Sequence, residues 1–428
     1  MGKWQGWKEL EELEQLILEQ GKKAKEAARD LASLSSEVKD RVLMAMAELL
    51  IKRQDSILRA NQEDLREARE KGLAASLLDR LLLTEDRIEA MAEGLREIAF
   101  LPDPVGEISE ISTRPNGLRV GKMRSPLGVV GIIYEARPNV TVDATGLCLK
   151  AGNSVLLRGG SEAIRSNQAL VQVLKEALIE RGLSENSVQL IQSTDRDAVV
   201  IMAKMDQYLD VIIPRGGRQL IKRVTEAATV PVIQTGVGNC HIYLDEKADL
   251  EKAVPIIKNA KCQRPGVCNA LETLLVHQSI GEVILPQIGE ALTEGGVLLK
   301  GCPKTQKFIP NAELATEEDW ATEYLDLTLA IKVVDSYREA LDHIHQFSTG
   351  HSEAIITEDY SKALDFLKQV DSATVYVNAS TRFTDGNQFG LGAEVGISTQ
   401  KLHVRGPMGV KDLTTQKYVI FGNGQIRS

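Results

Sequence analysis

Apolar residues recur at helical spacing through residues 8–100, among many Glu, Lys and Ala residues. The stretch "VKDRVLMAMAELLIKRQDSILRANQEDLREARE" shows this pattern, with charged residues filling the positions between the apolar ones. The spacing predicts several amphipathic helices. We expect their charges to face water, and we assign this segment a packing role without chemistry.

After "LPDP" the pattern changes to short apolar runs that alternate with helical segments. "GLRVGKMRSPLGVVGIIYE" predicts strands, "NSVLLRGG" precedes the helical "SNQALVQVLKEALIERG", and "LDVIIPRGG" precedes "RQLIKRVTEAAT". This alternation predicts a parallel sheet covered by helices on both faces. Ligands of such sheets bind beyond the carboxyl ends of the strands. The loops at those ends are Glu135–Asn139, Arg158–Ser161, Ser193–Asp195, Pro214–Gly217 and Gln234–Asn239.

A second alternating block contains the apolar runs "ALETLLVH", "GVLLKG", "LTLAIKVV", "SEAIITED" and "ATVYVNAS". It predicts a second α/β domain. The chain has 428 residues, and at ~150 residues per domain two or three domains are expected. The predicted fold class is therefore α/β, with two parallel-sheet domains.

Composition narrows the function classes. Apolar residues make up 43% of the chain and charged residues 26%, as in soluble globular proteins. The net charge of −9 predicts no broad basic surface, so we expect no nucleic-acid partner. The start "MGKWQGWKELEELEQ" lacks the apolar segment of a signal peptide, and runs such as "LGVVGIIY" are too short to span a membrane. Five cysteines without disulfide-like spacing favour reduced thiols in the cytoplasm.

Cys268 is the best placed of the cysteines to be a nucleophile. Such a thiol must be partly exposed and stabilised as thiolate by positive potential. Cys268 follows the turn Arg264-Pro265-Gly266 and precedes the run "ALETLLVH". Cys262 follows the predicted helix "LEKAVPIIKNAK", and we expect it to be structural. Because a Cys often serves only as a small apolar residue, position favours Cys268 but does not by itself decide its role.

Two loops have residues suited to phosphate. Gly216 and Gly217 stand between a predicted strand and helix, where backbone N–H groups and the positive helix end suit an anion. The G-x-G-x-x-G fingerprint is absent, and glycines also serve turn geometry alone. Arg158–Ser161 offers a cation, amides and a hydroxyl, which suit the 2′-phosphate of NADP or an ordinary surface loop. The histidines of "DHIHQFSTGH" lack completing ligands, so no metal site is predicted.

With these motifs in view, the chain resembles the aldehyde dehydrogenase superfamily and, within it, the γ-glutamyl phosphate reductases of proline biosynthesis. The resemblance is carried by "SPLGVVGIIYEARPNVTVDA", "QTGVGNCHIY", "RPGVCNALETLLVH", "STGHSEAIITED", "VYVNASTRFTDGNQFGLGAEVGIST" and "RGPMG". These motifs run from Ser125 to Gly409 and are long and specific. No kinase signature accompanies them, so the resemblance implies the stand-alone reductase.

The resemblance implies a role for each matching position. Cys268 would be the catalytic thiol, and the Asn139 amide would help to form the oxyanion hole. NADPH would contact Pro214, Arg215, Gly216 and Gly217 at its diphosphate, Arg158, Gly159 and Ser161 near the adenosine ribose, and Glu323 at the nicotinamide ribose. From charge and loop position, we expect Arg137, Ser380, Arg382 and Thr384 to anchor the substrate.

The segment "QTGVGN" departs from the hydrolytic members of the superfamily. Those enzymes place a Glu before a Gly pair, where it activates water against a thioester. Here Thr235 occupies the glutamate's place. Because water attack needs a positioned base, the loss would cripple an enzyme that makes acids from aldehydes. An acyl-phosphate reductase gains from the loss, since its thioester must survive until hydride arrives.

The implied activity is NADPH-dependent reduction of L-glutamyl 5-phosphate to L-glutamate 5-semialdehyde and phosphate through a Cys268 thioester. Residues 1–110 and 126–239 would bind the cofactor, 240–403 would carry the thiol, and 111–125 with 404–428 would form a β-arm. The strand edge of such an arm needs a partner, so a homodimer or higher oligomer is expected. Functional coupling to glutamate 5-kinase is a further expected partnership.

Three other functions stay open at this point. The enzyme could be a thiol-dependent reductase or dehydrogenase with another acyl donor, such as an acyl-CoA. It could be an acyltransferase or hydrolase that uses Cys268 without nicotinamide, or a nucleotide-binding protein with a degenerate site. The residues also leave NADPH against NADH undecided.

Overall fold

The computed structural model describes residues 2–427 and divides the chain into two compact units. Unit 1 comprises Met1–Gln234, Gly390–Gly396 and Met408–Ser428, and unit 2 comprises Thr235–Phe389 and Ile397–Pro407. Residues 390–396 lie inside the range predicted for the thiol domain but pack with unit 1, because the N–H of Val395 donates to the carbonyl of Met408 (3.0 Å). The functional assignment of the domain ranges stays a prediction.

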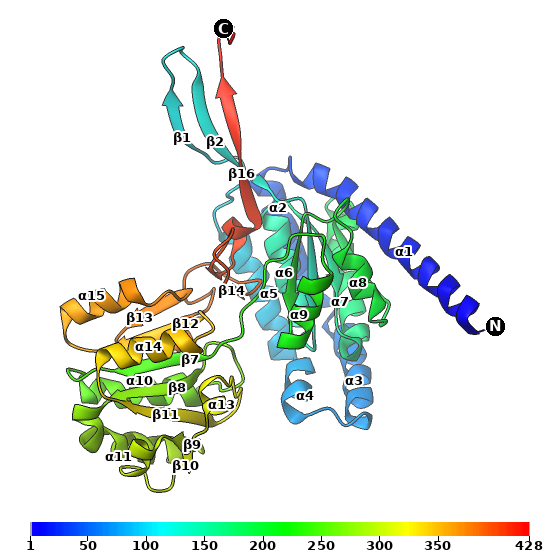
Figure 1. Cartoon of the computed structure of the whole chain (residues 1–428). Helices are drawn as coiled ribbons and strands as arrows, with labels where there is room; N and C mark the ends of the chain where they lie inside the picture. Colours follow the sequence, from blue (N-terminus) through cyan, green and yellow to red (C-terminus); the bar gives the residue numbers. More distant parts are fainter. Residues whose placement is uncertain (1, 428) are drawn as a thin grey trace. The chain divides into compact units, whose positions relative to one another are not determined.

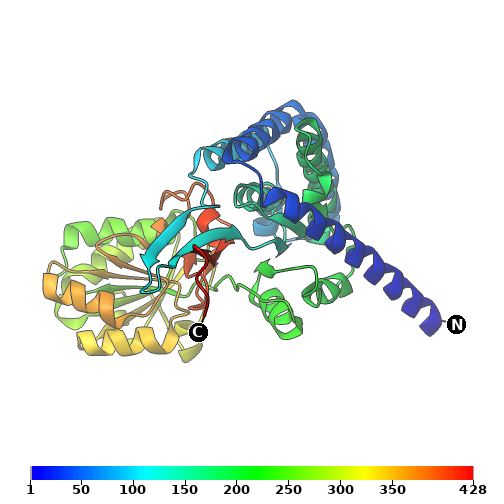
Figure 2. The same cartoon turned by 90° about the horizontal axis from the view of Figure 1, so that it is seen from above.

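Unit 1 begins with the helices that the spacing predicted. They are α1 (Gly2–Leu31), α2 (Ser36–Lys52), α3 (Gln54–Glu70), α4 (Ala75–Leu81) and α5 (Glu85–Phe100). Figures 1 and 2 show α1 as one long helix whose first turns extend beyond the other elements of the unit. Its later turns bury Ile17 and Ala24 in the core of unit 1.

The sheet at the centre of unit 1 has the strand order β5-β4-β3-β6, and all its strands are parallel. The strands are β3 (Val129–Tyr134), β4 (Ser154–Arg158), β5 (Val188–Leu190) and β6 (Val211–Arg215), with helices α6 (Asn139–Lys150), α7 (Ile164–Glu180), α8 (Asp197–Ala203) and α9 (Arg218–Ala227). Helices α1, α8 and α9 share one apolar cluster with Ile212 of the sheet. The alternation of apolar runs therefore correctly predicted a doubly covered parallel sheet.

Unit 1 also carries a three-stranded antiparallel arm of order β1-β2-β16. Its strands are β1 (Ile108–Thr113), β2 (Arg119–Pro126) and β16 (Thr414–Phe421). Figure 1 shows the first two in cyan and the last in red, so the arm joins distant parts of the sequence. Strand β16 lies at one edge of this sheet and exposes the side chains of Tyr418 (71%) and Ile420 (61%), which lie on the same face of the sheet.

Unit 2 is built on a seven-stranded sheet of order β10-β9-β11-β8-β7-β12-β13. The strands are β7 (Cys240–Leu244), β8 (Leu271–His277), β9 (Leu298–Gly301), β10 (Glu313–Leu314), β11 (Thr328–Val334), β12 (Ser352–Ile356) and β13 (Thr374–Val377). Its helices are α10 (Leu250–Cys262), α11 (Gln278–Glu294), α12 (Pro303–Gln306), α13 (Glu317–Trp320), α14 (Tyr337–Phe347) and α15 (Tyr360–Gln369). Every pair of neighbouring strands is parallel, as predicted for this block.

Successive residues of the central strands of unit 2 enter different cores. Leu274 of β8 packs in the cluster that contains residues of α10 and α11, and Leu275 packs in the cluster that contains residues of α14 and α15. This is the two-sided burial that a continuous apolar run predicts. Two short strands, β14 (Ile397–Ser398) and β15 (Gly406–Pro407), pair antiparallel near the end of the chain.

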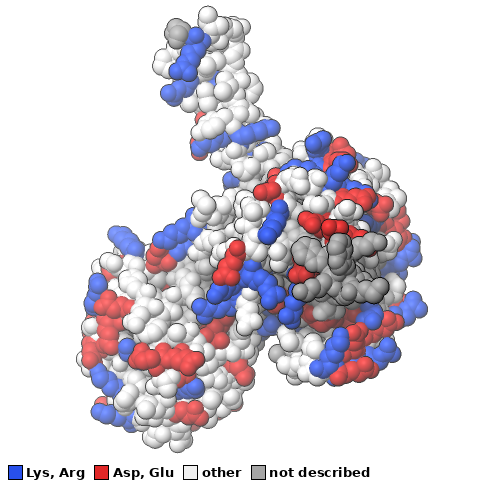
Figure 3. Space-filling model, turned by 45° about the vertical axis from the view of Figure 1, so that its right-hand side comes forward, with Lys and Arg blue, Asp and Glu red and all other residues white. Residues whose placement is uncertain are grey.

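The surface bears both signs of charge. On the face shown in Figure 3, Lys and Arg side chains are interspersed with Asp and Glu side chains on both units. Among residues 2–427, no helix is both long enough and apolar enough to cross a membrane.

Candidate active site

Cys268 lies in unit 2, in the loop that joins α10 to β8, and its side chain is half-buried. The segment before β7 lies directly against it. A Cβ built on Gly238 would lie 1.5 Å from the carbonyl oxygen of Cys268, so only glycine allows this approach. The thiol of the buried Cys240 donates to the same carbonyl oxygen (3.2 Å). The backbone of Cys268 is thus fixed from one side, while its thiol keeps some exposure.

Three of the other cysteines, Cys148, Cys240 and Cys262, are poorer nucleophiles. Within the described residues, which include all five cysteines, no disulfide forms. Burial raises the pKa of the Cys148 and Cys240 thiols, in the case of Cys240 with the help of Glu353. Burial also raises the pKa of Cys262, whose sulfur packs against the unit 2 core. The burial pattern therefore supports the choice of Cys268 over its neighbours.

Arg382 brings positive charge to the thiol. Burial, and after it the neighbouring Arg264, lower the pKa of Arg382, whereas Asp385 and Cys268 raise it. Its hydrogen bonds go to neutral amide oxygens: Nε donates to Oε1 of Gln263 (2.8 Å), and Nη1 donates to Oδ1 of Asn269. A guanidinium held by neutral acceptors keeps its charge available to a thiolate or to an anionic substrate.

The other two predicted anchors in this loop are buried. The hydroxyl of Ser380 accepts from the N–H of Arg382 (3.3 Å), which begins the short helical turn Thr381–Phe383. Thr384 is fully buried, and its hydroxyl bonds those of Ser352 and Tyr376 (both 2.7 Å). The geometry gives Ser380 and Thr384 the task of holding Arg382 in place, and direct contact with substrate stays an untested prediction.

Glu323 lies between α13 and β11 and binds the segment of unit 2 that covers Cys268. Its Oε1 accepts from the N–H of Gly238 at 2.7 Å. The neighbouring Asn239 is buried and donates to the carbonyls of Trp320 (2.8 Å) and Phe347 (2.9 Å). Thr235 is also buried and forms a β-bridge with Ser398. The place of the hydrolytic glutamate is therefore filled by a short side chain without a base.

Asn139 opens helix α6 of unit 1 and is exposed. Its Nδ2 donates to Oδ2 of Asp143, one turn later, at 2.9 Å. Burial raises the pKa of Asp143 to about 6, against the lowering effects of Asn139 and of Arg215. One N–H of the Asn139 amide thus orients the side chain, and its predicted role in an oxyanion hole stays a prediction. Arg137, the predicted substrate anchor, lies half-buried in the same loop.

The predicted diphosphate loop lies at the carboxyl end of β6. Pro214 is buried in the strand, and Gly216 and Gly217 are exposed before α9. The N–H of Gly217 donates to Oε2 of Glu135, the residue that follows β3, at 2.9 Å. A carboxylate therefore already occupies the anion position at this helix end. The next residue, Ala136, has a left-handed φ of +36° and donates its N–H to Oε1 of Glu162 (2.5 Å).

Arg158 is buried, which removes the alternative of an ordinary surface residue and leaves its predicted contact with the cofactor a prediction. Its guanidinium donates to the carbonyls of Gly159 (3.1 Å), Thr194 (3.3 Å) and Asp195 (3.0 Å), and burial lowers its pKa. It therefore ties two of the predicted ligand loops together. Gly159 is required there, because a Cβ would lie 2.1 Å from Nδ2 of Asn167.

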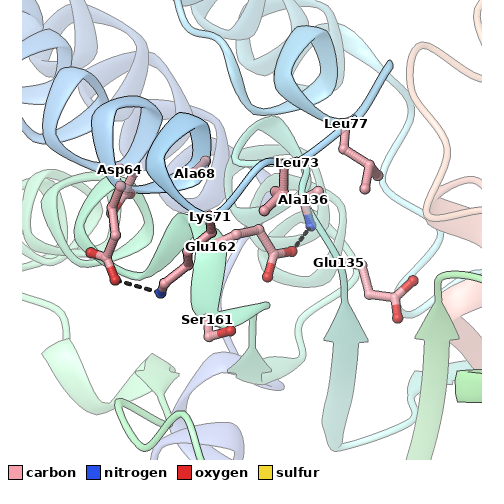
Figure 4. A pocket seen from close by; sticks show the side chains of 10 residues that line it. Asp64, Ala68, Lys71, Leu73, Leu77, Glu135, Ala136, Ser161 and Glu162 are labelled. Carbon is pink, nitrogen blue, oxygen red and sulfur yellow. Dashed lines mark hydrogen bonds and ion pairs between the residues drawn. The ribbon is translucent and has the colours of Figure 1, made fainter. Parts of the chain in front are cut away.

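Ser161 lines a cavity of about 390 Å³ within unit 1 (Figure 4). Part of its wall comes from Asp64 of α3, from Lys71 directly after α3 and from Leu77 of α4. The role of these helices in packing alone stays a prediction, and the structure adds that they border the cavity that Ser161 lines. Their amphipathic pattern identifies the apolar face of each helix, but it does not identify which polar residue borders a cavity.

Two histidines of the histidine-rich segment, His343 and His351, are buried in unit 2, whereas His345 is exposed. His343 lies among Trp320, Phe347 and His241, and burial lowers its pKa to about 2. Nδ1 of His241 lies 3.0 Å from Oε2 of Glu353. Among residues 2–427, no group of three or more His, Cys, Asp or Glu side chains could hold a metal ion.

Comparison with known proteins places this arrangement in context. The aldehyde dehydrogenase family model matches residues 14–299. The γ-glutamyl phosphate reductase of Moorella thermoacetica is 62% identical, covering 95% of this chain and 97% of the relative. That of Caldanaerobacter subterraneus subsp. tengcongensis is 61% identical, covering 95% and 98%.

Solved structures agree with the sequence relatives. The crystal structure of γ-glutamyl phosphate reductase from Thermotoga maritima is 52% identical, covers 96% of this chain and 100% of that one, and gives a TM-score of 0.94. An acetylating aldehyde dehydrogenase from Geobacillus thermoglucosidasius is 18% identical, covers 98% and 99%, and gives a TM-score of 0.73, which shows a shared fold.

Proposed function

The chain belongs to the aldehyde dehydrogenase family, and from that premise we propose that it reduces L-glutamyl 5-phosphate to L-glutamate 5-semialdehyde with NADPH. This is the second step of proline biosynthesis from glutamate. The observation that carries the proposal is a half-buried Cys268 beside Arg382, in a chain 62% identical to a γ-glutamyl phosphate reductase. The alternative of a degenerate nucleotide-binding protein loses support, because its residues would have no reason to keep this arrangement.

The chemical steps follow from the residues of each unit. Cys268 as thiolate attacks the acyl carbon, the carbon–oxygen bond to phosphate breaks, and inorganic phosphate leaves. The Asn139 amide and the N–H of Cys268 are proposed to stabilise the oxyanion, at about 3–4 kcal/mol for each donor of this kind. Arg382 is proposed to attract the anionic substrate. Thr235 offers water no base, so the thioester persists.

The proposed cofactor contacts come mainly from unit 1, and Glu323 belongs to unit 2. The turn at Gly216 and Gly217 suits a diphosphate, because its exposed N–H already binds a carboxylate. Ser161 and Glu323 are proposed to contact the adenosine and nicotinamide riboses. Arg158 is proposed to support this site by fixing the loops, since its guanidinium is buried. Bound NADPH supplies the hydride that reduces the thioester. Equilibrium binding of NADP⁺ and NAD⁺ tests the preference for NADPH.

The test of the activity runs the reaction backwards. Glutamate 5-semialdehyde and NADP⁺ are mixed with the protein, and absorbance of the reduced nicotinamide is followed with inorganic phosphate, with CoA, or with neither. Reduction that needs phosphate and vanishes in Cys268→Ala supports the proposal. Reduction that needs CoA selects the acyl-CoA alternative. Acyl transfer without any absorbance change selects the acyltransferase or hydrolase.

We further propose a homodimer or higher oligomer formed through the arm, and a cytoplasmic site of action in functional coupling to glutamate 5-kinase. The exposed Tyr418 and Ile420 on β16 support pairing with another chain. The thiols without disulfides suit a reducing compartment. Light scattering on the protein and on Ile420→Asp tests the oligomer, and co-elution with the kinase tests the coupling.

A further inference from the structure

Glu135 places a carboxylate where the proposed cofactor needs its diphosphate. Its Oε2 accepts from the N–H of Gly217 at 2.9 Å, at the positive end of the ten-residue helix α9. The carboxylate also covers Gly216, where a Cβ would lie 2.5 Å from Oε2. Two successive glycines of the predicted diphosphate loop are therefore in contact with one side chain.

The position of Glu135 is held by the backbone on either side of it. Its own N–H donates to the carbonyl of Arg215 (3.2 Å), which fixes the end of β3 against the end of β6. The following residue, Ala136, is in the left-handed region and is bound by Glu162. Figure 4 shows the Glu162 side chain, which comes from the turn after β4, reaching the N–H of Ala136, and the Glu135 side chain pointing away from it. Glu162 therefore binds the backbone that follows Glu135, while the Glu135 carboxylate itself binds at the helix end.

A diphosphate and this carboxylate cannot both bind the N–H of Gly217. Both are anions that seek the same donor and the same helix end, and two negative charges at one donor repel each other. Glu135 is exposed, so its side chain has room to rotate into water when it is displaced. Breaking the hydrogen bond between Glu135 and Gly217, and the repulsion that remains between the carboxylate and the diphosphate, both cost free energy. Binding of the cofactor is weaker by that amount.

We infer that Glu135 is an internal competitor of the dinucleotide diphosphate and weakens binding of NADPH and NADP⁺, which permits fast exchange of the cofactor between turnovers. This inference rests on the proposed function, because it takes the turn at Gly216 and Gly217 as the diphosphate site. It assigns Glu135 the role of setting cofactor affinity and release rate.

The experiment compares Glu135→Gln and Glu135→Ala with the unchanged protein. NADP⁺ and inorganic pyrophosphate are titrated separately, and cofactor release is followed by stopped flow. We expect NADP⁺ to bind about tenfold more tightly in both variants, equivalent to about 1.4 kcal/mol, with a matching decrease in release rate. Pyrophosphate affinity should rise in the same direction, since this probe carries only the group that competes.

Glu226→Gln is the matched control, because it removes one negative charge from the last turn of the same helix, away from the turn. Its NADP⁺ affinity should stay at the unchanged value, which separates local competition from a general change of charge. Unchanged or weaker NADP⁺ binding in both Glu135 variants, or equal tightening in Glu226→Gln, overturns the inference. Absence of NADP⁺ binding by the unchanged protein would instead overturn the cofactor assignment of the proposed function.

Discussion

The backbone of Gly238 lies against the backbone of Cys268 so closely that a Cβ on Gly238 would be 1.5 Å from the Cys268 carbonyl oxygen. A backbone contact of this kind cannot be relieved by rotating a side chain. The position of the loop that carries the thiol therefore depends on the position of the loop that precedes β7. A change in the backbone of either loop must move the other.

Gly238→Ala is expected to lower kcat about 100-fold, since a displacement of about 1 Å at a reacting group costs roughly that factor. Steady-state kinetics and thermal unfolding are measured together. Gly94→Ala is the control, because Gly94 lies in helix α5 and a Cβ there would have no neighbour within 4 Å. A Gly238→Ala enzyme with normal kcat would show that the thiol loop is not held by this contact.

Alkylation should distinguish the cysteines by burial. We expect iodoacetamide at neutral pH to modify Cys268 first, with loss of activity in proportion. Cys148 and Cys240 should stay unmodified in the folded protein, because burial both shields them and raises their pKa. Modification of Cys262 should increase as the pH rises, since its pKa is raised. Peptide mass spectrometry over time gives the order, and early modification of Cys240 would contradict it.

The loops of this site could be predicted because strand ends leave a clear trace in the sequence. The apolar runs before Pro214 and before Cys240 end in glycine-rich segments, and these segments do lie at the carboxyl ends of parallel strands or beside the thiol. In a parallel sheet such loops gather at the carboxyl ends of the strands. The topology therefore predicted where the loops lie, which the motifs alone did not.

The contacts between loops could not be predicted. Nothing in the sequence indicates that Glu135 reaches Gly217, since the two are brought together only by the pairing of β3 with β6. The burial of Arg158 depends in the same way on a loop 36 residues away, whose carbonyl it binds. Long-range partners of polar residues follow from tertiary packing, which local patterns do not encode.

Thr235→Glu should add a hydrolytic activity. A carboxylate at this place could activate water against the Cys268 thioester, so NADP⁺ reduction by glutamate 5-semialdehyde should become partly independent of phosphate. The measurement is the initial rate with and without phosphate. Thr235→Gln is the control, because Gln has nearly the same size as Glu but carries no base. This variant should keep the full requirement for phosphate. Equal phosphate-independent rates in both variants would attribute the effect to disturbed packing of this buried position.

Asp143 should contribute to the pH dependence through Asn139. Its pKa is about 6, so the carboxylate that accepts from Asn139 is lost as the pH falls through that value, and a neutral carboxyl is a weaker acceptor. We expect kcat to decline below pH 6 in the unchanged enzyme and this part of the decline to be absent in Asp143→Asn. The thiol titrates in both enzymes, so the ratio of their pH profiles isolates Asp143. Identical profiles would remove Asp143 from the mechanism.

Lys261 of helix α10 and Glu272 of strand β8 form a fully buried ion pair, with Nζ and Oε2 2.7 Å apart. The loop that carries Cys268 joins this helix to this strand. Burial raises the pKa of Glu272 to about 7 and lowers the pKa of Lys261. Removal of one partner leaves the other charged group buried without a counter-charge. We therefore expect Lys261→Met to reduce the free energy of unfolding by about 3–5 kcal/mol, and Lys261→Met with Glu272→Leu to recover most of the loss.

The pH dependence of this loss has a definite sign. A carboxyl whose folded pKa lies above its unfolded value favours the folded state when protonated, and this contribution disappears as the pH rises through the folded pKa. In Lys261→Met no cation opposes the rise in the pKa of Glu272, so the deficit in unfolding free energy should grow from pH 5.5 to pH 8.5, at about 1.4 kcal/mol per pH unit where the two states differ by one proton. Urea unfolding at both pH values measures it. A deficit that shrinks with rising pH would mean that Glu272 is ionised and solvated in the variant, and that the pair stabilises unit 2 by packing alone.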